Sequence, residues 1–415
     1  MYNSSAVQQN VIYQELSDMI SFTSDEIQRQ RELTENVVKR LLNKMRELSV
    51  SGDPVIEEDI IGTGSSFEGL KVREEHEFDF MIPIRSPLPY RLSPEFGTDK
   101  RDIKTILNMF GQIRCIRLQN VMEMQGGYYK RPADFKDKFC ANDYLSPKRI
   151  REWFQSLADR AVIHIKEKNM DLTFSQQGPA RTLNININKQ KPISVDLVPA
   201  VKTNDIYLVA KPYGGSPEDY YPSNDSLWRM SFSVQERLFI VQKTSTLPLN
   251  SCHRQALKIM KYIKQKERKN IPAPHWSSCL SSYHLKTAWL YLLQQNRPHE
   301  WQPSCLRERV LELIRKLVES LEDKQLYHFF LGNTTLLNEK VISDAYYSKG
   351  NLLSEMKSET LVQANSQLRI LYKNFDSMVN EICQNLQLNK QHNLESMENE
   401  IYQELPSQNS YCPIL

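Results

Sequence analysis

Two carboxylates inside an apolar segment constrain the fold of this chain more than any other feature. The segment runs from Glu77 to Ile84 (EFDFMIPI), and Glu77 and Asp79 are its charged residues. Its pattern predicts a buried β-strand, in which residues two apart share a face. We therefore expect Glu77 and Asp79 to project together while Phe78 and Phe80 enter the core. Burial of charge is costly unless something compensates it, so the pair predicts a cation site.

A third acid, Asp196, lies in a similar setting. It belongs to ISVDLVPAV (Ile193–Val201), where Ser194 and Val198 are expected to share its face. Three carboxylates that converge from adjacent strands can hold two hard cations, such as Mg²⁺ or Mn²⁺. Such ions bridge phosphate oxygens, activate an attacking hydroxyl and stabilise a leaving pyrophosphate. We predict Glu77, Asp79 and Asp196 as metal ligands and catalytic residues, with Asp196 receiving the proton of the attacking hydroxyl.

A small-residue turn before the acidic strand supplies a place for phosphates. The sequence there is Thr63-Gly64-Ser65-Ser66. Gly64 lets the backbone approach a phosphate closely, and Ser65 offers a hydroxyl and an N–H group. A helix that begins after this turn would direct its N-terminus at the anion.

The order of these features is more specific than any one of them. A Gly-Ser turn, then an acid pair, then an isolated aspartate in a later strand resembles the nucleotidyltransferase superfamily related to DNA polymerase beta. Within it, TGSSFEGLKVREEHEFDFMIPI resembles the metazoan cyclic GMP–AMP synthase and male-abnormal nucleotidyltransferase family, with its T-G-S-x-x-E-x-x-K and E-F-D signatures. The resemblance extends over residues 25–380 through four further blocks: LWRMSFSVQE (227–236), ALKIMKYIK (256–264), SSYHLKTAWL (281–290) and LYHFFLGNTTLL (326–337).

The resemblance implies a two-lobed fold whose cleft binds two nucleoside triphosphates with two Mg²⁺ or Mn²⁺ ions. Ser65, with Gly64 beside it, would contact the phosphates of the first nucleotide, and Thr63 would neighbour the second. Lys261 and Ser282 match phosphate contacts of the helical lobe, with Lys286 as a companion. A lysine is a good point charge for a triphosphate.

The WRMSFS block implies a second group of contacts. Arg229, Ser231 and Ser233 match residues that read the acceptor base, and Glu236 falls at a nucleotide-contacting position. A bidentate arginine suits the O6/N7 edge of guanine, which favours GTP beside ATP as substrates.

The order of predicted elements gives the domain organisation. A helix over 22–48 precedes strands within 55–85 and at 112–120, a helix over 145–168, and strands at 172–176, 182–188 and 193–201. Helices follow near 232–241, 251–268, 281–295, 303–323 and 355–385. This order predicts an α+β, two-lobed protein with a mixed twisted sheet in the N-lobe, a helical C-lobe and a cleft between them. We assign 1–20 to a flexible N-terminus, 21–245 to the nucleotidyltransferase core with its spine helix, 246–385 to the C-lobe and 386–415 to a weakly ordered tail.

Cysteine usage and hydropathy suggest the compartment. The chain has seven cysteines, scattered and without a CxxC pair, which predicts free thiols in a reducing environment. No apolar stretch is long enough to span a bilayer, and the first residues do not resemble a signal peptide. We therefore expect a cytoplasmic protein.

One departure from the family bears on the activating ligand. The vertebrate DNA-sensing members carry a zinc-binding insertion, whereas the segment between Glu236 and Cys252 has no His or Cys here. We expect no zinc; a site from Cys252, His253, His275 and Cys279 is disfavoured against buried thiols and ordinary histidines. Zinc-free relatives include receptors for double-stranded RNA, which is bound by shape and phosphates. Candidate RNA contacts are Lys39, Arg40, Lys44, Lys258 and Lys264; an ordinary solvated helix face is the alternative for each.

The leading hypothesis is an innate-immune, antiviral sensor. Double-stranded RNA would order the site, and the enzyme would join ATP and GTP into a cyclic dinucleotide for a downstream receptor of the STING type. The resemblance also implies a homodimer induced by the ligand. The alternative is a catalytically silent nucleotide-binding scaffold with a developmental or signalling role. A terminal RNA nucleotidyltransferase is a third hypothesis, but such an enzyme should lack the SSYHLKTA and WRMSFS blocks. Product linkage and the identity of the ligand do not follow from the sequence.

Overall fold

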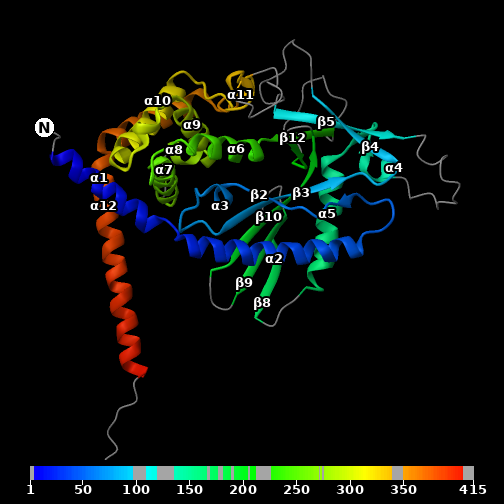
Figure 1. Cartoon of the computed structure of the whole chain (residues 1–415), viewed down its shortest axis with the longest axis horizontal. Helices are drawn as coiled ribbons and strands as arrows, with labels where there is room; N and C mark the ends of the chain where they lie inside the picture. Colours follow the sequence, from blue (N-terminus) through cyan, green and yellow to red (C-terminus); the bar gives the residue numbers. More distant parts are fainter. Residues whose placement is uncertain are drawn as a thin grey trace, which may run out of the picture.

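In the computed structural model of this chain, the described residues form a twelve-stranded mixed sheet that carries the acidic strands (Figure 1). The structure describes residues 4–96, 109–118, 135–165, 169–175, 181–187, 191–203, 206–211, 226–270, 272, 275–338 and 349–404. The main path of the sheet is β1-β3-β10-β11-β12-β5-β7-β6, with β2, β4, β8 and β9 paired beside it. The strands are β1 Val55–Ile56, β2 Ile61–Thr63, β3 Glu77–Arg85, β4 Tyr90–Glu95, β5 Phe110–Arg117, β6 Cys140–Ala141, β7 Tyr144–Leu145, β8 Met170–Ser175, β9 Arg181–Ile187, β10 Ile193–Lys202, β11 Tyr207–Val209 and β12 Leu227–Ser231.

The acidic strands are direct neighbours. β10 runs parallel to β3, and Asp196 is registered with Asp79 while Ser194 is registered with Glu77. Phe78 and Phe80 are buried on the opposite face of β3, as predicted. The predicted alternation of β10 is confirmed as well, because Ile193, Val195 and Leu197 are all buried while the residues between them are partly exposed.

Helices α2 (Ser24–Leu48) and α5 (Pro147–Val162) pack on each other and on the sheet (Figure 1). α2 is the predicted spine helix, and its start is closed by a capping box between Thr23 and Glu26. Such a box satisfies backbone donors that would otherwise have no partner. The buried face of α2 consists of Thr34, Val37, Val38, Leu41, Leu42 and Met45.

The second half of the chain is helical, as predicted. Its elements are α6 Ser233–Thr244, α7 His253–Arg268, α8 His275–Cys279, α9 Ser282–Gln295, the short 3₁₀ segments Pro298–Trp301 and Pro303–Cys305, α10 Leu306–Glu322, α11 Thr335–Asn338 and α12 Ser358–Glu404. Short helices α3 (Ser65–Glu68) and α4 (Phe135–Phe139) lie among the strands. The predicted α+β class is therefore correct, with a curled mixed sheet and a helical C-terminal part. The predicted strand and helix ends at 119–120, 166–168, 176 and 188 lie outside the described residues.

Both predicted ends of the chain need correction. Residues 4–20 form helix α1 (Ser4–Ile20) rather than a flexible segment, because Tyr13, Leu16 and Ile20 are buried against α7, α10 and α12. Tyr13 also hydrogen-bonds Asp376 of α12, with 2.8 Å between Oη and Oδ1. α12 does not end at 385 but continues to Glu404, within the predicted weakly ordered tail, whose residues 405–415 lie outside the described residues. Figure 1 shows its last part extending away from the other helices. Within the described part of the chain, no helix is long and apolar enough to cross a membrane.

Candidate active site

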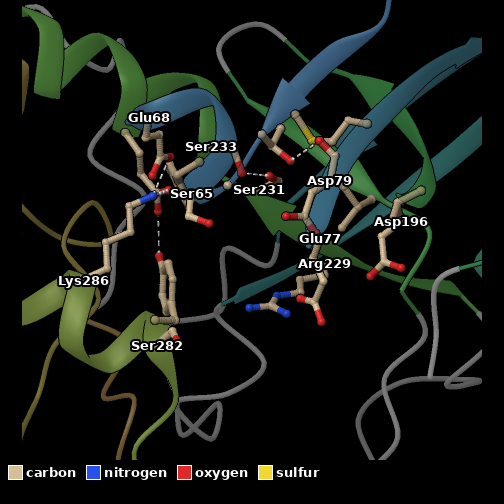
Figure 2. Close-up of a pocket in the computed structure, with 18 of the residues that line it drawn as sticks. Ser65, Glu68, Glu77, Asp79, Asp196, Arg229, Ser231, Ser233, Ser282 and Lys286 are labelled. Atoms are coloured by element: carbon tan, nitrogen blue, oxygen red, sulfur yellow. Dashed lines mark hydrogen bonds and ion pairs between the residues drawn. The ribbon is translucent and has the colours of Figure 1, made fainter. Parts of the chain in front are cut away.

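A cavity of about 690 Å³ lies between the acidic strands and the helices α6, α7 and α9. All the residues predicted to hold metal or nucleotide line it: Thr63, Gly64, Ser65, Glu77, Asp79, Asp196, Arg229, Ser231, Ser233, Glu236, Lys261, Ser282 and Lys286. Figure 2 shows Glu77, Asp79 and Asp196 at one side of this pocket, and Glu68 with Lys286 at the other. The structure thus brings together residues that are far apart in the sequence; their individual roles remain predictions.

The three carboxylates repel one another. Burial, and then the neighbouring Asp196 and Glu77, raise the pKa of Asp79 to about 7. Burial and Asp196 also raise the pKa of Glu77. No described lysine or arginine forms an ion pair with any of the three. Lys71 lowers the pKa of Glu77 and of Asp79, but burial and mutual repulsion outweigh it, so the face keeps an excess of negative charge that a bound divalent cation would relieve.

The carboxylate oxygens of this face suit hard cations, but the described side chains are not arranged around one metal position. Carboxylate oxygens are the ligands that Mg²⁺ and Mn²⁺ prefer. Among the described residues, no three His, Cys, Asp or Glu side chains are already positioned to hold a metal ion together. Thr182 donates to Oδ1 of Asp196 at 2.6 Å, which orients that carboxylate and leaves its Oδ2 without a bond to the described residues. Metal binding here would require rotation of side chains on a rigid pair of strands.

The phosphate turn is packed against the acids. Gly64 has φ +73°, and a Cβ built at this position would lie 2.5 Å from Oδ2 of Asp79. A side chain here would both strain the backbone and push the carboxylate away, which explains the glycine. The hydroxyl of Thr63 donates to the backbone oxygen of Asp79 at 3.3 Å, so the turn and β3 are fixed to each other.

Two predicted phosphate contacts meet at a residue that the sequence did not single out. Ser65 Oγ donates to Oε2 of Glu75 at 3.1 Å, and Lys261 Nζ lies 2.8 Å from the same oxygen. Lys261 also donates to the backbone oxygen of Leu70. Lys71, inside the T-G-S-x-x-E-x-x-K signature, is buried above the Phe78 ring and donates to the backbone oxygen of Glu77.

The strand β12 and the first residue of α6 supply the predicted base-reading side. The hydroxyl oxygens of Ser231 and Ser233 are 3.0 Å apart. Arg229 lies beside them in the pocket wall (Figure 2). Lys211 also lines this side, and its pKa is lowered by burial and by Arg229. The sequence analysis missed Lys211, which follows the short strand β11 without a charge pattern to mark it.

The opposite wall is a buried ionic chain, called here the Lys286 wall. Lys286 Nζ lies 2.6 Å from Glu68 Oε1 and also pairs with Glu236. Burial opposes its charge, but Glu236 and Glu68 outweigh that effect and raise the pKa of Lys286. Tyr283 Oη is 3.0 Å from Glu236 Oε1 and 2.8 Å from His328 Nε2. Because its ammonium is already bonded to two carboxylates, this geometry favours a structural role for Lys286 over the predicted phosphate contact.

A proton assignment follows for His328. Its Nδ1 accepts from the backbone N–H groups of Phe330 and Leu331, so Nε2 carries the hydrogen and donates to Tyr283. Tyr283 in turn donates to Glu236. Burial lowers the pKa of His328 to about 4, consistent with a neutral ring.

The predicted RNA contacts are only partly available. Lys39 is exposed, whereas Arg40 is half-buried and donates to the backbone oxygen of Ile165. Lys44 pairs with Glu47, and Lys258 donates to Ser21. Lys264 is 6% exposed, which disfavours the predicted contact with a nucleic-acid backbone. The disfavoured zinc candidate His253 hydrogen-bonds Ser251 and stacks on Trp289.

Comparison with known families adds an independent observation. Residues 66–242 match the model of the Mab-21 protein nucleotidyltransferase domain, and residues 252–369 match that of the Mab-21 protein HhH/H2TH-like domain. The chain is 30% identical to the inositol 1,4,5-trisphosphate receptor-interacting proteins of Bos taurus and Danio rerio, over 74% and 75% of this chain. It spans 58% and 61% of the length of those relatives. It is 23% identical to a cyclic GMP-AMP synthase-like receptor of Tribolium castaneum, over 95% of this chain and 97% of that protein.

Proposed function

The chain belongs to the Mab-21 nucleotidyltransferase family, and on this basis we propose that it is a receptor enzyme which makes a cyclic dinucleotide from ATP and GTP. One observation carries the proposal. The registered pair Asp79–Asp196, with Glu77 beside it, forms an acidic face that has no ion pair with the described residues and adjoins a phosphate turn within a single pocket. The full-length similarity to a cyclic GMP-AMP synthase-like receptor supports the same reaction class.

The pocket residues would have different roles, according to the chemistry of their side chains. Ser65 and Lys261 would hold the triphosphate, and Arg229 with Ser231 and Ser233 would orient the acceptor base. Asp196, whose Oδ1 is held by Thr182, would receive the proton of the attacking hydroxyl at Oδ2. Divalent ions held by Glu77, Asp79 and Asp196 would neutralise the charge that develops on the phosphates.

Double-stranded RNA is the activator that we propose. The available basic surface is on α2, where Lys39 is exposed and Lys44 is partly exposed. An RNA backbone on this face would act through phosphate contacts, so activation should weaken as salt rises. The product would then act on a separate cyclic-dinucleotide receptor.

A product assay tests the proposal. Purified protein is mixed with four labelled triphosphates and Mg²⁺ or Mn²⁺, with no nucleic acid, long duplex RNA or long duplex DNA. A phosphatase-resistant cyclic dinucleotide that appears with RNA, and is absent from the Glu77→Ala/Asp79→Ala double variant, supports the proposal. No product under any condition from folded, nucleotide-binding protein would contradict it.

A second function is favoured by the names of the 30%-identical relatives. The chain would then be a nucleotide-binding scaffold that associates with an inositol 1,4,5-trisphosphate receptor. Co-precipitation with the purified receptor tests this function. The scaffold hypothesis expects binding that survives Glu77→Ala/Asp79→Ala, whereas the enzyme hypothesis expects no binding.

A further inference from the structure

One carboxylate that lines the pocket, that of Glu75, is bonded to two residues predicted to contact phosphates. Oε2 of Glu75 lies 3.1 Å from Ser65 Oγ and 2.8 Å from Lys261 Nζ. The backbone N–H of Val72 also points to this oxygen, at 3.4 Å. A hydroxyl, an ammonium and a backbone N–H converging on one anionic oxygen is the donor set that binds phosphate oxygens. We propose that Glu75 is an autoinhibitory internal anion, which a triphosphate must displace from Ser65 and Lys261.

The proposal rests on the proposed function, because Ser65 and Lys261 are the predicted phosphate contacts. A phosphate cannot share these donors with Glu75 at low cost, since the two anions would lie side by side in a partly buried site. Lys261 is 7% exposed and Glu75 is 21% exposed, so their ion pair is more protected from solvent than a surface pair. The pair therefore competes effectively with an incoming anion.

The segment that carries Glu75 is fixed on its outer side. Arg73 donates from Nε to the backbone oxygen of Ser21 at 2.8 Å and pairs with Glu26 at 3.1 Å. Val72 forms a bridge with Ser21. These contacts keep residues 72–73 beside the start of α2, so Glu75 is presented to the pocket by a fixed backbone. Displacement then requires rotation of one side chain rather than movement of the whole segment.

The neighbouring acid provides a matched control. Glu74 pairs with Lys269 at the surface, where the lysine side chain is 65% exposed. Glu74→Gln and Glu75→Gln remove the same charge from adjacent positions, but only Glu75 bonds Ser65 and Lys261. A difference between the two variants therefore reports the local contact and not the net charge.

The test is a calorimetric titration of the full chain with inorganic tripolyphosphate, without divalent ions, so that the carboxylates of β3 and β10 do not contribute through metal. Glu75→Gln should bind the probe about tenfold more tightly than the wild type, because a competing anion is lost. Glu74→Gln should bind like the wild type. Glu75→Ala serves as a second variant and should show the same gain. Each variant is checked for its unfolding midpoint.

The outcomes separate this inference from the proposed function. Equal or weaker binding by Glu75→Gln and Glu75→Ala overturns the inference, since Glu75 would then position Ser65 and Lys261 rather than block them. An equal gain in Glu74→Gln overturns it as well. Tighter probe binding by both Glu75 variants, in a protein that makes no dinucleotide, supports the inference and contradicts the proposed function. No binding by any form, the Glu75 variants included, overturns the inference and leaves the proposed function to the product assay.

Discussion

Two walls of the same pocket contain carboxylates, buried in one wall and exposed or partly exposed in the other, and they differ in the source of their counter-charge. In the Lys286 wall, Glu68 and Glu236 are bridged by a lysine of the chain itself. On the β3–β10 face, Glu77, Asp79 and Asp196 have no such bridge among the described residues. The pKa values record the difference. Burial would raise the pKa of Glu236, but Lys286 outweighs burial and the pKa is lowered. The pKa of Asp79, by contrast, is raised by burial to about 7.

The difference indicates different purposes. A lysine held between two carboxylates, 12% exposed, gives a fixed structure that does not depend on solution ions. An acidic face whose carboxylates form no ion pair with the described residues, and only weak interactions with Lys71, is a destabilisation that the fold tolerates, as functional sites often do. We infer that the Lys286 wall holds its side chains in fixed positions, whereas the β3–β10 face binds a cation from solution. The predictions below test this contrast.

The largest expected effect is on catalysis at the β3–β10 face. Asp79→Asn keeps the shape of the side chain but removes one ligand charge, so dinucleotide synthesis should fall at least about a thousandfold. The free energy of unfolding should be unchanged or higher, because repulsion with Asp196 and Glu77 is relieved. Product formation and urea denaturation measure the two quantities. Synthesis within tenfold of the wild-type rate would remove Asp79 from the catalytic set.

The opposite pattern is expected in the Lys286 wall. Lys286→Met leaves two buried carboxylates without their cation, and should lower the free energy of unfolding by about 3–5 kcal/mol. Lys269→Met, which breaks a surface pair with Glu74, should cost less than about 1 kcal/mol. Urea denaturation of both variants gives the comparison. Equal small losses would show that Lys286 is not the counter-charge of this wall.

A smaller effect should appear as acid sensitivity of the same wall. The pKa of His328 is lowered by burial from 6.5 to about 4, so the ring is neutral in the folded protein. Its contribution to stability is complete above pH 6.5 and is lost as the pH falls towards 4, by up to about 3 kcal/mol. Denaturation between pH 7 and pH 4 should therefore show a shallower loss in His328→Gln. The exposed His299→Gln should follow the wild type; a parallel loss in all three proteins would rule out His328 as the cause.

Much of the β3–β10 face could be predicted because its signal is local. The i, i+2 spacing of Glu77 and Asp79 and the alternation around Asp196 fix which side chains share a face, and the family blocks supply the remaining pocket residues. The Lys286 wall could not be predicted in this way. Glu68 and Glu236 are 218 and 50 residues away from Lys286 in the sequence, and no pattern in either segment predicts that they pair with it.

The errors at the chain ends have a different cause. α1 has a polar composition, but Tyr13, Leu16 and Ile20 recur at helical spacing, and this stripe was a usable signal. Away from the ends, Lys264 was predicted as an RNA contact because of its charge, although it is buried together with Met260 and Ile263 on the same helix. In both cases composition was given more weight than periodicity.

The most direct test of the contrast is a Mn²⁺ titration in the presence of a non-hydrolysable ATP analogue, followed by electron paramagnetic resonance. The account predicts two ions bound per chain in the wild type and in Lys286→Arg. It predicts loss of at least one ion in Asp79→Asn, and weaker binding below pH 7, where the raised pKa of Asp79 lets a proton compete with the metal. Wild-type protein that binds nucleotide but no Mn²⁺, or Asp79→Asn that binds Mn²⁺ as well as the wild type, would contradict the account.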